Sequence, residues 1–218
     1  MKPAAFLFDL DGTLVDTEAV WARAMVDLVV SRGGRTTVQK ILPVVVGRNW
    51  LDVHAALHEM YPVLGDTTLM QDAIELRKFY NRHVDDPQTM RIESSIAFFA
   101  KVATIAPCAI VSGSPHADVA NAAALCGIAD RVSLILGAGE YAEGKPSPSG
   151  YLKAAQLLGV NPADCVVIED STVGVASGVS AGMKVLALDR STTIPQRHDG
   201  CTWLVRDLSE IDIEKEFS

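Results

Sequence analysis

The sequence predicts an α/β fold, in which a doubly wound, Rossmann-like parallel sheet carries a small inserted helical domain. Three observations predict it: short apolar runs end at polar clusters, helical patterns follow most of these runs, and one long stretch near the N-terminus is helical throughout. Apolar runs without alternating polar residues are typical of strands covered on both faces, as in a parallel sheet. Strands that alternate with helices indicate the doubly wound class.

Five apolar runs are the expected strands of the sheet, at residues 4–8, 109–111, 132–136, 166–168 and 185–188. Helical patterns lie between them, among them residues 116–126 and 151–158. The second of these ends at Gly159, because glycine readily adopts the left-handed conformation of a helix end.

The stretch at residues 17–87 has helical spacing and no convincing strand, so it breaks the alternation. We expect the chain to leave this stretch at Pro87, because proline resists continuing a helix. The sequence therefore predicts an α/β core of residues 1–16 and 88–218, and an inserted helical domain of residues 17–87.

The composition is that of an ordinary globular protein, with 49% hydrophobic and 21% charged residues among 218 and a formal net charge of −8. That charge argues against non-specific nucleic-acid binding, which needs a basic face. No apolar run approaches the roughly 20 residues of a membrane-spanning helix, and the N-terminus does not resemble a signal peptide. We expect a cytoplasmic monomer that acts on a small molecule, with buried thiols at Cys108, Cys126, Cys165 and Cys201.

Polar groups follow three of the expected strands. Asp9 and Asp11 come directly after the first strand, where acidic side chains are costly unless they are paired or bound to a cation. Ligands of an open parallel sheet lie beyond the carboxyl ends of its strands. Ser112 and the pair Glu169-Asp170 follow two further strands, and the loop that holds Lys145 could approach the same edge.

Carboxylates beside one serine and one lysine predict a site for a hard metal next to an anion. Oxygen ligands favour Mg²⁺, which is commonly shared with a phosphate. Taken alone, each residue has a simpler interpretation: the aspartates as a turn, Ser112 as a helix N-cap and Lys145 as a surface lysine. Their occurrence together at strand ends favours the functional interpretation.

Four motifs stand in the order and spacing of one known family: DLDGT at 9–13, the VSGS serine at 112, GKP at 144–146 and IEDS at 168–171. The chain resembles the haloacid dehalogenase-like superfamily over essentially its whole length, in the branch of phosphatases and phosphomutases with a helical cap. The resemblance implies that Asp9 is the nucleophile and forms an aspartyl-phosphate. It implies that Asp11 protonates the leaving oxygen and later activates water.

The resemblance also implies a set of binding residues. Mg²⁺ would be held by Asp9, by the backbone carbonyl of Asp11 and by Asp170, with Glu169 acting through water. The residues expected at the phosphate are Ser112, Lys145, Gly12 and Thr13.

The expected activity is hydrolysis of a small phosphorylated metabolite, such as a sugar or sugar-acid phosphate. The alternative is a phosphomutase of the β-phosphoglucomutase kind, but that kind carries a histidine in the first cap helix where Trp21 stands here. An indole cannot relay protons as an imidazole can, so this departure favours hydrolysis. A phosphate-binding module without turnover is a further alternative, although binding alone would not need Asp11.

Two features of residues 17–87 bear on ligands. Arg48 lies between two expected helices, and with Trp21 it is the candidate for substrate specificity, because a guanidinium can bind a second anionic or hydroxyl-rich end of a substrate. His54 and His58 share one helical face, but Ala55 stands where a zinc protease needs glutamate. We therefore expect these histidines to lie on an ordinary solvated or packed helix.

Overall fold

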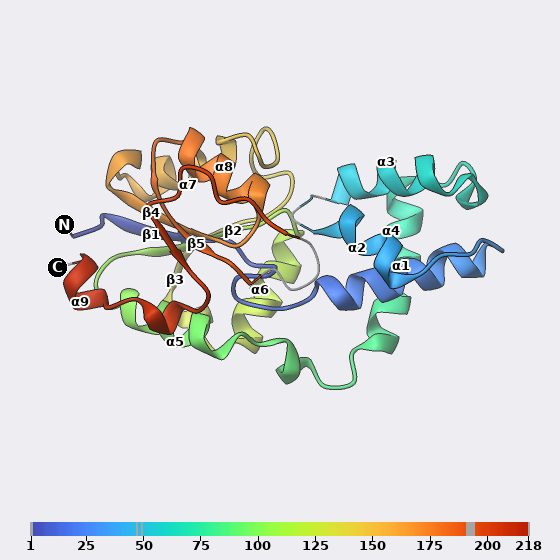
Figure 1. Ribbon diagram of the computed structural model, residues 1–218, viewed down its shortest axis with the longest axis horizontal. Helices are drawn as coiled ribbons and strands as arrows, with labels where there is room; N and C mark the ends of the chain where they lie inside the picture. The colour runs from blue at the N-terminus through green and yellow to red at the C-terminus, as the bar shows by residue number, and fades with distance from the viewer. Residues whose placement is uncertain (1, 47, 49, 191–194, 218) are drawn as a thin grey trace. The chain divides into compact units, whose positions relative to one another are not determined.

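The computed structural model describes residues 2–46, 48, 50–190 and 195–217 (Figure 1). The chain divides into two compact units. One joins Met1–Asp16 to Arg91–Ser218, and the other is Thr17–Met90. The sequence predicts the same first boundary and places the second at residue 87.

The first unit is built on a six-stranded parallel sheet with the strand order β3-β2-β1-β4-β5-β6. The order reverses at β1, since its Phe6 lies opposite Cys108 of β2 on one side and Val166 of β4 on the other. This confirms the predicted doubly wound sheet. The strands are β1 Ala5–Phe8, β2 Cys108–Val111, β3 Val132–Leu136, β4 Cys165–Glu169, β5 Lys184–Leu188 and β6 Trp203–Val205.

The edge strand β6 is not predicted from the sequence. Its three residues are partly exposed and lie in an otherwise polar stretch, so the apolar run is too short to stand out.

Helices cover both faces of the sheet (Figure 1). Alternate side chains of a strand point to opposite faces, so Phe6 and Phe8 pack with α5, α6 and α9, whereas Leu7 packs with α7 and α8. Complete burial of one such phenylalanine contributes about 1.5–3 kcal/mol to stability. These helices are α5 Glu93–Val102, α6 His116–Leu125, α7 Ser149–Leu158, α8 Thr172–Ser180 and α9 Ile213–Phe217.

Three local predictions about the first unit have clear outcomes. Gly159 follows α7 in the left-handed conformation, with φ of 69°, as predicted. Ser112 is not a helix N-cap, because Pro115 occupies that position before α6. The four cysteines are free thiols, and burial is confirmed for Cys108, Cys126 and Cys165. Cys201 is only half-buried, so the prediction of a buried thiol is wrong for that residue.

The second unit contains four helices and no strand in its described residues. They are α1 Glu18–Ser31, α2 Val38–Val45, α3 Trp50–Met60 and α4 Leu69–His83, with short 3₁₀ turns at Pro62–Leu64 and Pro87–Met90. A reciprocal capping box of Thr68 and Gln71 starts α4. The helices share a core that includes Leu28, Leu57 and Leu76. Among the described helices of both units, none has the length and apolar character needed to cross a membrane.

Candidate active site

The carboxyl ends of β1, β2 and β4 meet at the point where the strand order reverses. Asp9 follows β1, Ser112 follows β2 and Glu169 is the last residue of β4. Because β1 pairs with both other strands, residues far apart in the sequence are brought to one edge of the sheet. Ligands of open α/β sheets bind at such a reversal point.

Lys145 joins the ends of β1 and β4. Its ammonium group contacts the carboxylate of Asp9 and lies 2.5 Å from Oε1 of Glu169. It also donates to the carbonyl of Val111 at 3.3 Å. Burial alone would lower the pKa of Lys145, but the charges of Asp9 and Glu169 outweigh it and hold that pKa well above its usual value. The lysine is therefore a fixed positive charge at this edge.

Glu169 is completely buried and both of its oxygens accept hydrogen bonds. Oε1 accepts from Lys145 and from the hydroxyl of Tyr151 at 2.9 Å. Oε2 accepts from the backbone N–H of Asp170 and from the N–H and hydroxyl of Ser171. The α8 helix leaves room for this carboxylate only because residue 174 is glycine, where a Cβ would lie 1.9 Å from the Glu169 carboxyl group.

Asp170 is packed against the loop that follows β1. Its Oδ1 accepts from the buried hydroxyl of Thr13 at 3.3 Å. Gly12 has φ of +88°, and a Cβ there would lie only 2.1 Å from Oδ2 of Asp170. Glycine is therefore required at residue 12 both by the backbone conformation and by the neighbouring carboxylate.

The side chain of Asp11 is held by two serines of the loop after β2. Its Oδ2 accepts from Ser114 Oγ at 2.9 Å and from Ser112 Oγ at 3.4 Å. Ser112 Oγ in turn accepts from the N–H of Ser114 at 3.0 Å. Ser114 is absent from the residues predicted from the sequence, although it is the last residue of the VSGS motif.

The carboxylates at this edge fit a divalent cation. One oxygen each of Asp9, Glu169 and Asp170 lies within 4.8 Å of the others. Burial raises the pKa of Asp9 to about 8, and the charges of Glu169 and Asp11 add to this effect while Lys145 opposes it. A cation among these oxygens would relieve the cost of burying their charge, and a donor set made only of oxygens suits Mg²⁺.

The two residues predicted to set specificity lie in the helical unit. The Trp21 ring is half-buried, with its centroid 4.2 Å from that of Tyr80 and 5.0 Å from the guanidinium carbon of Arg77. Arg48 is exposed, and its N–H donates to the carbonyl of Val45. Its neighbours Gly47 and Asn49 lie outside the described residues.

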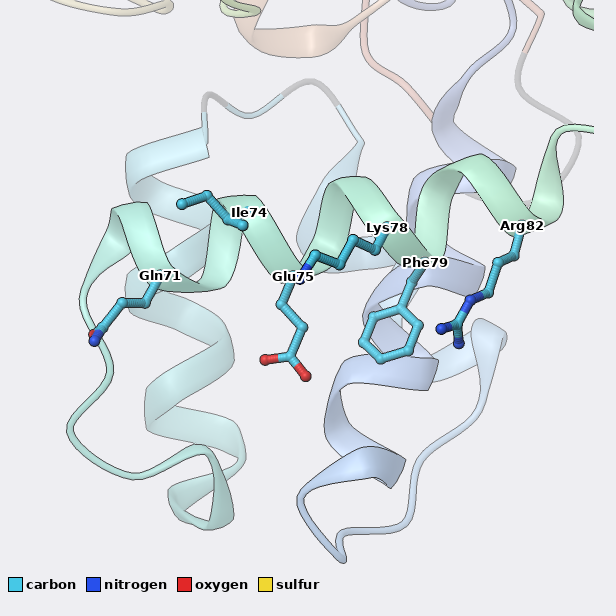
Figure 2. Close-up of a pocket in the computed structure, with 6 residues that line it drawn as sticks. All are labelled: Gln71, Ile74, Glu75, Lys78, Phe79 and Arg82. Carbon is cyan, nitrogen blue, oxygen red and sulfur yellow. The ribbon is translucent and has the colours of Figure 1, made fainter.

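A hollow of about 350 Å³ runs along α4 in the helical unit (Figure 2). None of the residues predicted for the site lines it. The guanidinium of Arg82 lies over the ring of Phe79 beside it, 5.0 Å from the ring centroid. Its lining residues are Gln71, Ile74, Glu75, Lys78, Phe79 and Arg82.

Comparison with known proteins identifies the family to which the chain is similar. The family model of haloacid dehalogenase-like hydrolases matches residues 3–182. Hexitol phosphatase A of Escherichia coli is 28% identical over 220 residues, which cover 99% of this chain and 96% of that protein. The bifunctional riboflavin kinase/FMN phosphatase of Arabidopsis thaliana is also 28% identical and matches 96% of this chain, which spans only 54% of that longer protein.

The fold has solved counterparts. A β-phosphoglucomutase from Clostridium difficile superimposes with a TM-score of 0.83 at 23% identity, covering 99% of this chain and 95% of that one. The chain belongs to the haloacid dehalogenase-like hydrolase family. This confirms the family and the hydrolase class predicted from the motifs, with phosphatases among the relatives.

Proposed function

We propose that the chain is a magnesium-dependent phosphatase that hydrolyses a small phosphorylated metabolite, a sugar or sugar-acid phosphate. The observation that supports this most strongly is the meeting of Asp9, Lys145 and Asp170 at the reversal point of the sheet. That edge offers a carboxylate nucleophile, a fixed positive charge and oxygen ligands for a metal. The similarity to hexitol phosphatase A supports the substrate class.

In the proposed reaction an oxygen of Asp9 attacks phosphorus, and the bond from phosphorus to the leaving oxygen breaks. Asp11 gives its proton to that oxygen, so the alcohol leaves in neutral form. Water then attacks the aspartyl-phosphate and Asp11 takes a proton from it. The bond between phosphorus and Asp9 breaks, which releases inorganic phosphate and restores both residues.

Ser112 and Lys145 would bind the phosphoryl oxygens in this proposal. Magnesium, held by Asp9, Asp170 and the carbonyl of Asp11, would neutralise negative charge on the transferring group. Because both oxygens of Glu169 already accept hydrogen bonds, we assign it to holding Lys145 in place.

In this proposal Gly12 and Thr13 would shape the loop without contacting the phosphate. Their N–H groups donate to the carbonyls of Val15 and Leu10, and the Thr13 hydroxyl donates to Asp170. The sequence predicts both among the phosphate-binding residues, and the hydrogen bonds favour a supporting role.

The test is phosphate release from a panel of hexitol, sugar and sugar-acid phosphates, with magnesium and with excess chelator. We expect turnover of at least one sugar-class phosphate, lost with chelator and restored by magnesium. Full activity in chelator would contradict the metal assignment. An isomerised sugar phosphate in place of inorganic phosphate would instead identify a phosphomutase, and absence of turnover on every phosphate ester would leave a binding module.

We also expect a monomer in the cytoplasm. The four free thiols support a reducing compartment. The oligomeric state is tested by the mass of the chain in solution.

A further inference from the structure

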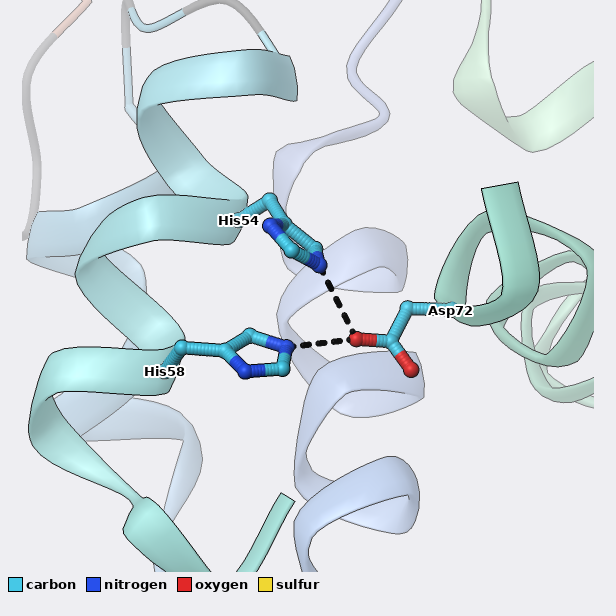
Figure 3. Close-up of side chains that lie close together, drawn as sticks. All are labelled: His54, His58 and Asp72. Carbon is cyan, nitrogen blue, oxygen red and sulfur yellow. Dashed lines mark hydrogen bonds and ion pairs between the residues drawn. The ribbon is translucent and has the colours of Figure 1, made fainter. Parts of the chain in front are cut away.

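Two histidines and one aspartate converge inside the helical unit, and none of them belongs to the residue set of the site at the sheet. His54 and His58 lie one turn apart on α3, and Asp72 lies in the first turn of α4. Both imidazoles point at the same carboxylate (Figure 3). Nε2 of His54 is 3.2 Å from Oδ2 of Asp72, and Nε2 of His58 is 2.7 Å from it.

The polar atoms of this cluster are incompletely satisfied. Asp72 is 1% exposed, so its charge needs compensation. Oδ1 of Asp72 and Nε2 of His54 are buried without a hydrogen-bond partner. The nearest cation to Oδ1 is Arg32 at 3.9 Å, and the guanidinium of that arginine donates to Glu75 at 2.5 Å. The cluster thus holds two buried polar atoms without a hydrogen-bond partner, and the Nε2 atoms of both histidines face the same carboxylate oxygen, Oδ2 of Asp72.

The hydrogen bonds of His58 show which of its ring nitrogens is free to bind a proton or a cation. Its Nδ1 lies 3.1 Å from the carbonyl of Gly65, and a carbonyl can only accept, so Nδ1 carries a hydrogen. In a neutral imidazole Nε2 then bears a lone pair, which faces a carboxylate oxygen at 2.7 Å. Either a second proton or a cation must lie between them.

Metal-bound histidines have this same arrangement. A ligating imidazole typically donates its other N–H to a backbone carbonyl or a carboxylate, which fixes the ring and its tautomer. Burial, assisted by the charge of His58, lowers the pKa of His54 against the opposing effect of Asp72. The neutral form of the imidazole is the one that binds metals.

We propose that His54, His58 and Asp72 form a binding site for a divalent transition metal, with zinc as its cation. Two imidazoles and a carboxylate suit zinc and do not suit magnesium. Ligand atoms about 2.0–2.2 Å from a tetrahedral zinc ion lie roughly 3.3–3.6 Å apart. The distance of 3.2 Å from His54 Nε2 to Asp72 Oδ2 is close to this range, and the distance of 2.7 Å from His58 Nε2 would have to lengthen by somewhat more than half an ångström.

Such a metal would join α3 to the start of α4. The turn between these helices takes part too, because the Gly65 carbonyl holds His58. Three protein ligands leave a fourth position on a tetrahedral ion for water. The metal would therefore stabilise the helical unit, and this inference does not depend on the proposed phosphatase reaction.

The test must separate this cluster from the carboxylates at the sheet, which could also take up zinc. We would use the full chain with Asp170→Asn, treated with chelator and then dialysed, and titrate it with Zn²⁺ by calorimetry. A second chain adds His54→Gln and His58→Gln. The matched control adds His83→Gln instead, because His83 in the same unit contacts a single carboxylate, that of Asp27, at 2.8 Å.

We expect one equivalent of zinc to bind to the Asp170→Asn chain and to the His83 control. The double histidine variant should lose on the order of 100-fold or more in affinity. Zinc should also raise the unfolding temperature of the Asp170→Asn chain and of the His83 control, and not that of the double histidine variant. Equal zinc affinity in all three chains, or no zinc binding to the Asp170→Asn chain, would overturn the proposal.

A spectroscopic test covers the case in which the histidine variant does not fold. Co²⁺ bound to the Asp170→Asn chain should show the visible absorption of a tetrahedral site, and X-ray absorption with Zn²⁺ should show two imidazole ligands. An octahedral cobalt spectrum, or zinc with oxygen ligands only, would overturn the proposal.

Discussion

The ammonium nitrogen of Lys145 lies 2.5 Å from Oε1 of Glu169, a carboxylate that is completely buried. Glu169 accepts hydrogen bonds from Tyr151, from the N–H of Asp170 and from Ser171, so its carboxylate is fixed and holds the lysine in place. The proposed phosphate ligand is thus positioned by a residue that need not touch the substrate. Preorganised charges of this kind stabilise the charge that develops in a transition state.

Glu169→Gln should weaken this support. The amide retains the shape but gives Lys145 no counter-charge, so kcat/KM should fall by roughly 10–100-fold, as for other residues that position a ligand. The matched control is Glu140→Gln, since Glu140 is half-exposed and pairs with His116 at the surface. Steady-state kinetics on one phosphate ester would check both variants, and equal rates for wild type and Glu169→Gln would refute the positioning role.

The raised pKa of Asp9 predicts how stability depends on pH. Its folded-state value of about 8 lies above the ordinary value of 3.8, so the folded chain binds more protons than the unfolded chain between those limits. The Asp9 contribution is therefore favourable at low pH and is lost as the pH rises through about 8.

Two consequences can be measured by thermal unfolding without metal. Asp9→Asn should raise the unfolding temperature at pH 8, because it removes the free-energy cost of burying the Asp9 charge. The rise should be roughly 2–4 °C for each 1 kcal/mol of that cost, and the effect should be smaller near pH 4. Magnesium should stabilise the wild type more at pH 8 than at pH 5, because it binds the ionised carboxylate. A destabilised Asp9→Asn chain at pH 8 would show that Asp9 is not strained by burial.

Gly12→Ala should displace Asp170. The added Cβ would lie 2.1 Å from Oδ2 of that residue, so we expect the magnesium concentration for half-maximal activity to rise by about tenfold or more. Gly127→Ala is the matched control, because Gly127 has a similar φ of +68° and no atom within 4 Å of the added Cβ. Both variants should lose about 1–2 kcal/mol of stability from the backbone conformation. A magnesium requirement that rises equally in both would rule out the contact as its cause.

Much of the α/β core can be predicted from the sequence, because its strands and site residues are visible in short sequence patterns. The five predicted strands are apolar runs, and the alternation of strand and helix in a doubly wound sheet brings Asp9, Ser112 and Glu169 to one edge. The motif residues stand at strand ends, where a sheet places its ligands.

The contacts that complete the site could not be predicted in this way. Tyr151 reaches Glu169 from the first turn of α7, and Gly174 makes room for that carboxylate, yet neither stands in a motif. The same holds in the helical unit, where His54 and His58 share a visible spacing but Asp72 comes from α4 and joins them only in the folded unit. These relationships depend on tertiary packing between segments, which a local pattern does not encode.

Arg48→Ala tests the source of specificity. Arg48 is exposed, so its removal should not affect folding. We expect kcat/KM for the best metabolite to fall by about tenfold, on the order of 1.4 kcal/mol, while a small aryl phosphate is hydrolysed at nearly the wild-type rate. Equal losses on both substrates would remove the specificity role, and Trp21, stacked on Tyr80, would then be the remaining candidate.

The most direct test of the central claim is the position of the phosphoryl group on the enzyme. In the Asp11→Asn chain an aryl phosphate, whose leaving group needs no proton, should still phosphorylate the nucleophile, while the missing base slows hydrolysis of the product. Acid quenching, digestion and mass spectrometry should then find one phosphoryl group, on Asp9, and none when Asp9→Asn is added. A phosphoryl group on another residue, or no phosphoenzyme while phosphate is still released, would contradict the proposed mechanism.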